Sequence, residues 1–193
     1  MTPLHLPLSI EAVRSLALGD NVLLTGTIFT ARDVAHKYLA GTPDATRVPD
    51  LTGAVLYHCG PVIVREGDGW RVTAAGPTTS IREEPYEATL IEKFGLRAII
   101  GKGGMGAKTL AACKQFGCVY LTAVGGAAQV VASSIQKVTG VYMLEEFGAP
   151  EALWELQVVE MPLIVTMDAH GNSLYRQVQE RSQEVFRQLT SSL

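Results

Sequence analysis

The sequence predicts an α/β domain. Its 193 residues are enough for one domain with a sizeable core and marginal for two. Hydrophobic residues make up 47% of the chain and charged residues 18%, which is typical of a well-buried globular protein and excludes a disordered one. Strand-like runs dominate the first half of the chain, and they alternate with helical patterns later. We therefore expect residues 1–193 to form a single α/β domain.

The predicted strands are short runs of β-branched and aliphatic residues, many of them bounded by glycine turns. The run "NVLLTGTIF" is the first of them, and three short runs follow a polar, proline-bearing loop at residues 41–50. The predicted strands cover residues 21–29, 53–58, 60–64, 70–76, 96–101, 118–124, 140–147 and 162–168.

The predicted helices are marked by caps and by apolar periodicity. Thr30 is a favourable N-cap with Asp33 three residues later, and Gly95 and Gly117 are placed to end two helices. The closing helix has apolar residues at helical spacing: Leu174, Val178, Val185, Phe186 and Leu189. The predicted helices cover residues 30–40, 84–95, 106–117, 126–138 and 172–193.

Charge and targeting signals narrow the function classes. The net charge of −3 argues against a nonspecific nucleic-acid binder, which is usually basic. The N-terminal residues have no basic start and no long apolar run, and the longest apolar stretch is too short to cross a membrane. We expect a cytoplasmic protein that binds neither nucleic acid nor membranes.

The three cysteines do not form a recognisable framework. Cys59, Cys113 and Cys118 are odd in number and lack a C-x-x-C pair, so a disulfide scaffold is disfavoured. Free cysteine is among the most buried residue types, and we expect the thiols of Cys113 and Cys118, between a helix end and the next strand, to lie in the core. An iron–sulfur cluster needs three or four organised thiolates, which this chain does not visibly supply.

Candidate ligand-binding residues gather where strands end and helices begin, which is where open α/β sheets bind ligands. Arg32 falls in the first turn of a predicted helix, where a cation opposes the helix dipole unless it joins in holding an anion. The segment "GPTTSIR" offers the hydroxyls of Thr78, Thr79 and Ser80 beside the forked guanidinium of Arg82. The alternatives are a solvated arginine at position 32 and an ordinary helix cap before an acidic first turn.

A glycine-rich loop, "GKGGMG", follows the predicted strand at residues 96–101. Such a loop lets backbone amides approach an anion, and Lys102 lies inside it. The loop resembles a nucleotide-binding phosphate loop, but Ala107 shifts Lys108 out of the required position, which disfavours a nucleoside triphosphatase. Arg32, Arg82 and Lys102 together suit a small diacid better than a mononucleotide.

The turn "MDAHGN" carries Asp168, His170 and Asn172, which have catalytic side chains but also form an ordinary turn pattern. Metal binding there is disfavoured because no partner histidine or cysteine stands at ligand spacing.

Four motifs, in this order, carry a family resemblance: "GTIFTARDVAHK", "YHCGP", "AAGPTTSIR" and "GKGGMG". The chain from about residue 20 to residue 172 resembles the beta region of the class I, iron–sulfur-dependent hydro-lyases, which include fumarate hydratase and L(+)-tartrate dehydratase. The resemblance implies a swivelling β/β/α domain with a mixed sheet and flanking helices. It also implies that a separate alpha subunit ligates a catalytic [4Fe-4S] cluster, whose open iron acts as a Lewis acid.

The resemblance also implies roles for individual residues. By motif, Arg32, Arg82 and Lys102 bind the substrate carboxylates, and Thr78 is the proposed catalytic base. The remaining substrate-binding positions are Thr79, Gly101 and Gly103. Threonine is a poor base unless it is activated, so orientation of the substrate is the alternative role for Thr78.

Three interpretations of function stay open from the sequence. The first is the beta subunit of a two-subunit fumarate hydratase, which hydrates fumarate reversibly to L-malate and works as a hetero-oligomer with its alpha subunit, with a homo-oligomer as the alternative for the isolated chain. The second is the beta subunit of L(+)-tartrate dehydratase, whose substrate is also a four-carbon dicarboxylate. The third, from another class, is a stand-alone module that binds an anion or nucleotide through the glycine loop.

Overall fold

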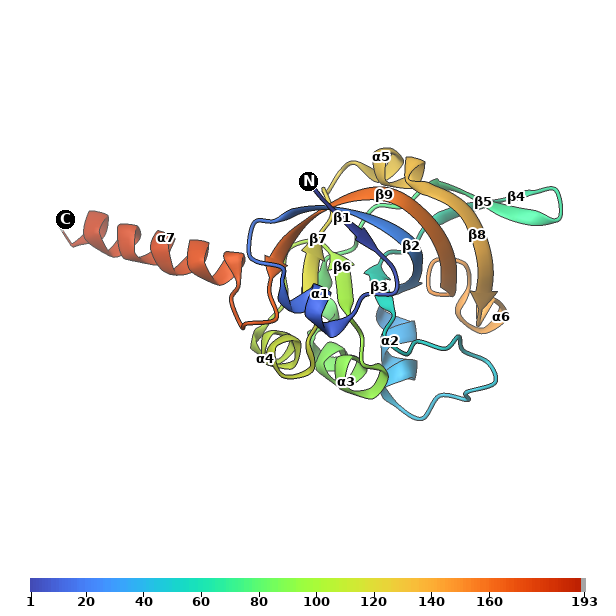
Figure 1. Cartoon of the computed structure of the whole chain (residues 1–193), viewed down its shortest axis with the longest axis horizontal. Helices are drawn as coiled ribbons and strands as arrows, with labels where there is room; N and C mark the ends of the chain where they lie inside the picture. The colour runs from blue at the N-terminus through green and yellow to red at the C-terminus, as the bar shows by residue number, and fades with distance from the viewer. Residues whose placement is uncertain (192–193) are drawn as a thin grey trace.

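The computed structural model describes residues 1–191 as a curved mixed sheet with helices on both sides (Figure 1). The strands are β1 (Thr2–His5), β2 (Asn21–Ala31), β3 (Val55–His58), β4 (Val62–Glu66), β5 (Gly69–Ala74), β6 (Ala98–Gly101), β7 (Val119–Thr122), β8 (Ile135–Tyr142) and β9 (Leu153–Met167). The helices are α1 (Ile10–Arg14), α2 (Asp33–Ala40), α3 (Glu84–Phe94), α4 (Ala107–Phe116), α5 (Ala128–Ser133), α6 (Leu144–Phe147) and α7 (Leu174–Thr190), with a 3-10 turn η1 at Ser80–Glu83 before α3.

The seven-stranded sheet has the order β1-β2-β3-β6-β7-β9-β8, and β4 and β5 form a separate hairpin. Strands β1, β2, β3, β6 and β7 run parallel to one another. The long strand β9 is antiparallel to β7 and also pairs antiparallel with β2, so the sheet curls back on itself. An α/β fold with a mixed sheet and flanking helices was predicted, and it is confirmed.

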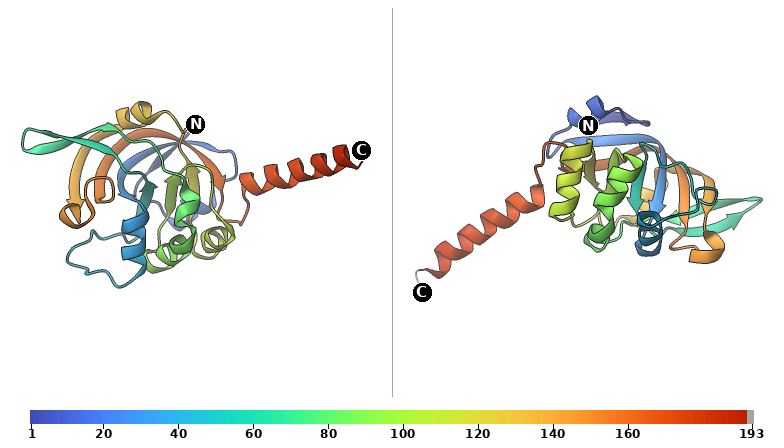
Figure 2. Two further views of the ribbon diagram at one scale, coloured as in Figure 1. Left: turned by 180° about the vertical axis from the view of Figure 1, so that it is seen from behind. Right: turned by 90° about the horizontal axis from the view of Figure 1, so that it is seen from below.

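The sheet separates two hydrophobic cores. On β3, Val55 and Tyr57 pack into one core and Leu56 into the other, as the alternation of side chains along a strand requires. The first core, which includes the buried Trp154, lies within the curve of the sheet. The second lies between the sheet and α2, α3 and α4, the helices that cover its other face in Figure 2. Because both faces are covered there, the central strands β3, β6 and β7 are buried along nearly their whole length.

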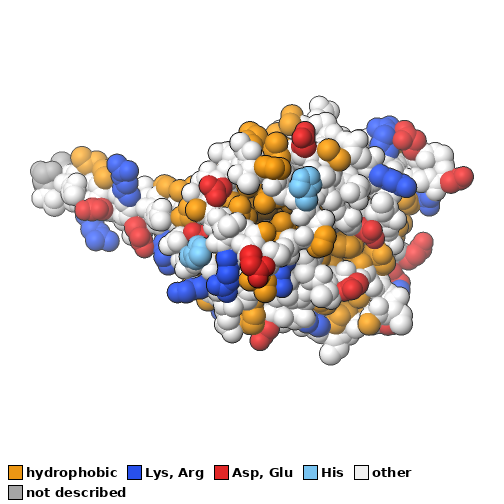
Figure 3. Space-filling view, viewed as in Figure 1, with side chains coloured by type: hydrophobic (Ala, Val, Ile, Leu, Met, Phe, Trp, Pro, Cys, Tyr) orange, Lys and Arg blue, Asp and Glu red, His pale blue; other side chains and the backbone are white. Residues whose placement is uncertain are grey.

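The closing helix α7 projects away from the body of the molecule (Figure 1). None of its residues is buried, and its apolar side chains lie on the surface (Figure 3). The exposed apolar residues are Leu174, Val178, Val185, Phe186 and Leu189. The predicted amphipathic helix is therefore present, but its apolar face does not pack on the sheet. In the described part of the chain, no helix is long and apolar enough to cross a membrane.

Several element boundaries differ from the prediction. Thr30 does not cap a helix: it is buried in β2, which pairs with β3 up to Ala31, and its Oγ1 accepts the N–H of Trp154 at 3.0 Å. Helix α2 therefore begins only at Asp33, with Arg32 as its N-cap. The predicted ends at Gly95 and Gly117 are confirmed, with φ of 59° and 73°.

The last third of the sheet was predicted least well. Only α5 of the helix expected at residues 126–138 exists, because Ile135 already pairs with β9 as the first residue of β8. The strand expected at residues 140–147 ends at Tyr142, and α6 follows. Strand β9 begins at Leu153, nine residues before the predicted strand at residues 162–168, and residues 192–193 of the predicted closing helix lie outside the described residues.

Candidate functional site

The candidate site lies at the edge of the sheet where parallel strands β2, β3 and β6 end. These strands are neighbours in the sheet and end at Ala31, His58 and Gly101. Carboxyl ends of parallel strands meet at one edge, where α/β folds bind ligands. The predicted substrate-binding residues lie at or just after these strand ends, in the loop that connects β5 to η1, or in η1 itself.

Arg32 lies directly after β2 and is only partly buried. A Cβ added to Gly60 would come within 2.7 Å of Arg32 Cδ, so the arginine stem runs across this glycine. Its Nε is 3.4 Å from Oε1 of Glu151, and the other carboxylate oxygen of Glu151, Oε2, accepts the N–H of Val34 in the first turn of α2. The glycine of "YHCGP" thus makes room for Arg32, and the guanidinium forms an ion pair with Glu151, although its buried Nε has no hydrogen-bond partner among the described residues.

Arg82 lies in η1, and its side chain is 55% exposed. Its Nη2 is 2.8 Å from Oδ2 of Asp33, and Nη2 of Arg32 is 3.9 Å from the same oxygen. Asp33 therefore links the two arginines, although they lie 50 positions apart in the sequence. The structure brings these two predicted cations together at one carboxylate.

Thr78 and Thr79 connect the loop after β5 to the ends of β3 and β6. The N–H and the Oγ1–H of Thr78 both donate to the carbonyl of His58, at 2.7 Å and 3.1 Å. Thr79 forms a β-bridge with Lys102, and the N–H of Ser80 donates to the Lys102 carbonyl at 3.1 Å. The two threonines and Lys102 thus lie at the same sheet edge as the arginines.

Gly101 and Gly103 stand where a side chain would clash with a neighbour or where the chain turns sharply. A Cβ on Gly101 would meet the side chain of Ser80 and would lie 2.8 Å from the hydroxyl of Tyr120. Gly103 has a φ of 79°, in the left-handed region that favours glycine, so it turns the chain after Lys102. These contacts explain Gly101 and Gly103 by packing and turn geometry, and their predicted substrate contact stays a prediction.

The N-terminus of α4, which follows the glycine loop, is occupied by a carboxylate of the chain itself. Glu84 accepts the N–H groups of Gly106 (2.7 Å), Lys108 (3.0 Å) and Thr109 (3.3 Å), and also the Thr109 hydroxyl (2.7 Å). These are the amides that a phosphate would use at a helix N-terminus. The observation argues against the glycine loop as a nucleotide site.

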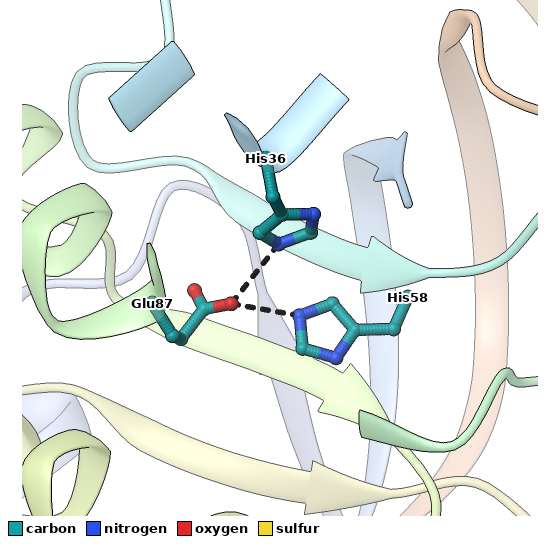
Figure 4. A group of neighbouring side chains, drawn as sticks. All are labelled: His36, His58 and Glu87. Atoms are coloured by element: carbon teal, nitrogen blue, oxygen red, sulfur yellow. Dashed lines mark hydrogen bonds and ion pairs between the residues drawn. The ribbon is translucent and has the colours of Figure 1, made fainter. Parts of the chain in front are cut away.

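A buried polar cluster lies beneath the site and was not predicted. His36 Nε2 and His58 Nε2 lie 3.0 Å and 2.9 Å from the same oxygen, Oε2 of Glu87 (Figure 4). His58 Nδ1 is 2.9 Å from Ser80 Oγ, which also accepts a 2.8 Å hydrogen bond from Tyr120. All of these residues are buried. One ligand atom from each of His36, His58 and Glu87 lies within 4.8 Å of the others, a spacing that could also hold a metal ion, and Oε1 of Glu87 has no hydrogen-bond partner among the described residues.

The ionisation of this cluster follows from burial and mutual contact. Burial alone would raise the pKa of Glu87, but the two histidines outweigh it and hold this pKa at about 2. Burial lowers the pKa of His58, whereas at His36 the contact with Glu87 outweighs burial and raises the pKa. Burial raises the pKa of Glu83, whose Oε2 is 3.5 Å from His36 Nδ1, to about 7.

Comparison with known proteins shows which family the chain belongs to. The family described as "Fumarase C-terminus" matches residues 3–178, which is most of the chain. The chain belongs to the fumarase C-terminal family. The resemblance inferred from the four motifs is thereby confirmed.

Curated relatives of this fumarase C-terminal chain carry two kinds of name. A putative class I fumarate hydratase of Geobacillus stearothermophilus is 52% identical over 94% of this chain and 35% of the relative. A putative L(+)-tartrate dehydratase subunit beta of Methanocaldococcus jannaschii is 43% identical over 92% of each chain. The L(+)-tartrate dehydratase subunit beta of Escherichia coli is 38% identical over 87% of this chain and 83% of the relative. The chain thus spans about a third of the fumarate hydratase.

The turn "MDAHGN" of this fumarase C-terminal chain lies away from the candidate site. It follows β9, which runs antiparallel to β7, so it leaves the sheet at the opposite edge. The carboxylate of Asp168 accepts the N–H groups of His170 and Asn172, at 3.0 Å and 2.9 Å. The structure therefore agrees with the ordinary-turn interpretation of these residues.

The cysteines of this family member do not form a cluster-binding set. All three are free and buried, which confirms the burial predicted for Cys113 and Cys118. Cys59 packs in the core within the curve of the sheet, whereas Cys113 and Cys118 pack in the core under the helices. Because the sheet separates them, the described cysteines do not fit an iron–sulfur cluster.

Proposed function

We propose that this chain supplies the carboxylate-binding half of the active site of an iron–sulfur-dependent hydro-lyase acting on a four-carbon dicarboxylate. One observation carries the proposal: Arg32, Arg82 and Lys102, beside the hydroxyls of Thr78 and Thr79, lie at one edge of the sheet. The relatives named hydratase and dehydratase support the hydro-lyase class.

In this proposal the cations hold both carboxylates of the substrate. A guanidinium forms two parallel hydrogen bonds to a carboxylate, which fixes its orientation as well as its position. When a proton leaves the carbon beside a carboxylate, negative charge moves onto the carboxylate oxygens. Preorganised cations at those oxygens stabilise the transition state more than the ground state.

Thr78 is our candidate for the residue at the transferred proton. Its hydroxyl donates to the His58 carbonyl, so its only donor is used and its lone pairs remain free to accept. Donation to a carbonyl also makes the oxygen more electron-rich, although less than a neighbouring base would. Orientation of the substrate hydroxyl or of water by Thr78 is the alternative role.

We propose that the [4Fe-4S] cluster comes with an alpha-type partner subunit. The separation of the three cysteines supports this division of labour. Two relatives that this chain covers almost fully are named subunit beta, a name that implies a companion subunit. We further propose that the chain acts as a swivelling domain that closes over the substrate against this partner.

The apolar face of α7 is our candidate for part of the subunit interface. Val178 and Phe186 on this face are 58% and 66% exposed, on a helix that projects from the body. A row of exposed apolar side chains along one helix face is a feature of interaction sites in soluble proteins. The opposite face of the helix carries charged residues such as Arg176 and Glu180, which suit contact with water.

Fumarate is the substrate that we propose, with tartrate as the alternative. The support is sequence identity: 52% to the relative named fumarate hydratase against 43% and 38% to those named tartrate dehydratase. The stand-alone nucleotide module is less well supported, because Glu84 fills the helix terminus that a phosphate would need.

The test is co-expression of the chain with an alpha-type subunit under anaerobic conditions, followed by assays with fumarate and with L(+)-tartrate. The proposal expects the complex to interconvert fumarate and malate faster than it dehydrates tartrate. Faster turnover of tartrate would favour the alternative. An inactive complex with a fully loaded cluster, or tight nucleotide binding by the chain alone, would contradict the proposal.

A further inference from the structure

The buried cluster of His36, His58 and Glu87 joins the segments that carry the candidate site. His36 lies one turn after Arg32 on α2, His58 ends β3, and Glu87 lies on α3 (Figure 4). Burying such groups costs free energy unless each finds a partner. None of the three has a role in the function proposed above, so their burial needs its own explanation.

The hydrogen bonds fix the charge of His36. Its Nδ1 is 2.9 Å from the carbonyl of Arg32, and a carbonyl can only accept, so this nitrogen carries a proton. Its Nε2 is 3.0 Å from the carboxylate of Glu87, so this nitrogen also carries a proton if Glu87 is ionised. His36 is then an imidazolium paired with a buried carboxylate.

The hydrogen bonds also fix the tautomer of His58. Tyr120 donates its hydroxyl to Ser80, so the Ser80 hydroxyl has its own proton left to donate to Nδ1 of His58. His58 then accepts at Nδ1 and donates from Nε2 to Glu87, which is the neutral imidazole. The raised pKa of His36 and the lowered pKa of His58 agree with this assignment.

At each end of the cluster, a histidine is tied by hydrogen bonds to a candidate site residue. His36 holds the carbonyl of Arg32, and the carbonyl of His58 accepts both hydrogen bonds from Thr78. Glu87 Oε2 ties the two histidines together, so a shift of one moves the other.

We propose that His36, Glu87 and His58 are positioning residues, which set the distance between Arg32 and Thr78 through an imidazolium–carboxylate–imidazole chain. The inference rests on the proposed function, because it concerns the geometry of that active site. A displacement of about 1 Å at residues remote from the chemistry can lower turnover roughly 100-fold, so such positioning has measurable weight.

The charge pattern is tested first, by ¹⁵N NMR of the histidine rings in the wild-type chain. The sequence has four histidines, and His→Gln variants assign their signals. At pH 7.5 we expect His36 to be protonated on both nitrogens, since Glu83 and Glu87 face it. At pH 5.5 we expect His58 to stay neutral with its proton on Nε2, although Glu87 and Asp33 favour its cation, since burial and the charged His36 oppose it. A neutral His36 at pH 7.5 or a charged His58 at pH 5.5 would overturn the proposal.

The positioning role is tested by two variants at one site in the assembled enzyme. His58→Gln can still donate to Glu87, whereas His58→Leu fills similar space and donates nothing. We expect kcat of the Leu variant to fall roughly 100-fold per folded complex, and that of the Gln variant to stay close to wild type. The matched control is His5→Gln, at an exposed position of β1 outside the site.

The outcomes separate this inference from the proposed function. A wild-type complex without hydro-lyase activity would remove the proposed function, and the positioning role with it, whatever NMR shows. An active wild type with equal kcat in both His58 variants, when circular dichroism shows both folded, would overturn the positioning role alone. If His58→Leu does not fold, the NMR assignment of the wild type still decides the charge pattern.

Discussion

Asp33 accepts a 2.8 Å hydrogen bond from Nη2 of Arg82. Nη2 of Arg32 lies 3.9 Å from the same carboxylate oxygen, so one acidic side chain lies between two of the three proposed substrate-binding cations. The candidate site therefore already accommodates a carboxylate, that of Asp33, beside both arginines. A substrate carboxylate has the same charge and the same planar shape, which makes the contact a guide to how the arginines bind one.

The chain without its partner should have no hydro-lyase activity. The physical reason is that its described cysteines lie on two sides of the sheet and cannot gather around a cluster. Fumarate hydration should be measured for the chain, for the alpha-type subunit and for the two together, after cluster reconstitution in each sample. Activity of the chain alone would contradict the two-subunit account.

Replacing Glu84 with alanine should destabilise the fold. Glu84 accepts four hydrogen bonds at the start of α4, three of them from backbone amides. Loss of a charged cap should lower the free energy of unfolding by about 1–3 kcal/mol. Urea denaturation measures the change, and Glu92→Ala on the exposed face of α3 is the control. Equal effects of the two variants would show that the cap contributes little.

Glu83 should make stability depend on pH. Burial raises the pKa of Glu83 from 4.5 to about 7, so between these pH values the folded chain holds a proton that the unfolded chain has lost. This contribution to the free energy of unfolding therefore falls as pH rises from about 4.5 to about 7. Glu83→Gln removes the titration, and its stability relative to wild type should rise across this window by about 3 kcal/mol at 1.36 kcal/mol per pKa unit.

The measurement is urea denaturation of wild type and Glu83→Gln at pH 4.5, 6 and 7.5. Glu92→Gln, at an exposed position of α3, shows the effect of the same substitution in solvent. A constant difference between wild type and Glu83→Gln at all three pH values would mean that Glu83 titrates as an ordinary carboxyl group.

Phe186→Glu on α7 should weaken subunit association and leave folding intact. Phe186 is 66% exposed, so its replacement should change the free energy of unfolding by no more than about 0.5 kcal/mol. An aromatic residue at an interface often contributes more than 1.4 kcal/mol, so Kd for the alpha-type subunit should rise about tenfold or more. Arg187→Gln, on the charged side of α7 opposite its apolar face, changes the net charge by the same amount and is the control. Equal Kd values for both variants would place the interface elsewhere.

The sequence was sufficient to predict the elements whose signals are local. Gly95 and Gly117 end α3 and α4 as predicted, because a left-handed residue after a helix favours glycine. Thr30 was misread because a good capping residue also fits a buried strand when a distant backbone group bonds it, here the N–H of Trp154. Ile135 was assigned to a helix because its pairing with Val158 on β9 is not visible in a local window.

Only the part of the candidate site that has local sequence signals was predicted. Arg32, Arg82 and Lys102 stand in recognisable motifs after strands, and the parallel sheet brings them to one edge. The buried cluster was missed because its contacts are long-range, such as the 51-residue separation between His36 and Glu87. Two signals were present: His36 follows Arg32 by one helical turn, and His58 is polar at the end of an apolar strand.

The central claim is that Arg82 binds a substrate carboxylate, and kcat/KM of Arg82→Lys in the assembled enzyme tests it most directly. Lysine keeps the charge but loses the forked geometry, so the loss should be about 2–4 kcal/mol of transition-state stabilisation, or roughly 30- to 1000-fold in kcat/KM. Stability should change by no more than about 1 kcal/mol, because the pair with Asp33 is exposed. Arg14→Lys, in α1, is the control. A value of kcat/KM for Arg82→Lys equal to that of Arg14→Lys would contradict the account and leave Arg82 as a surface ion pair.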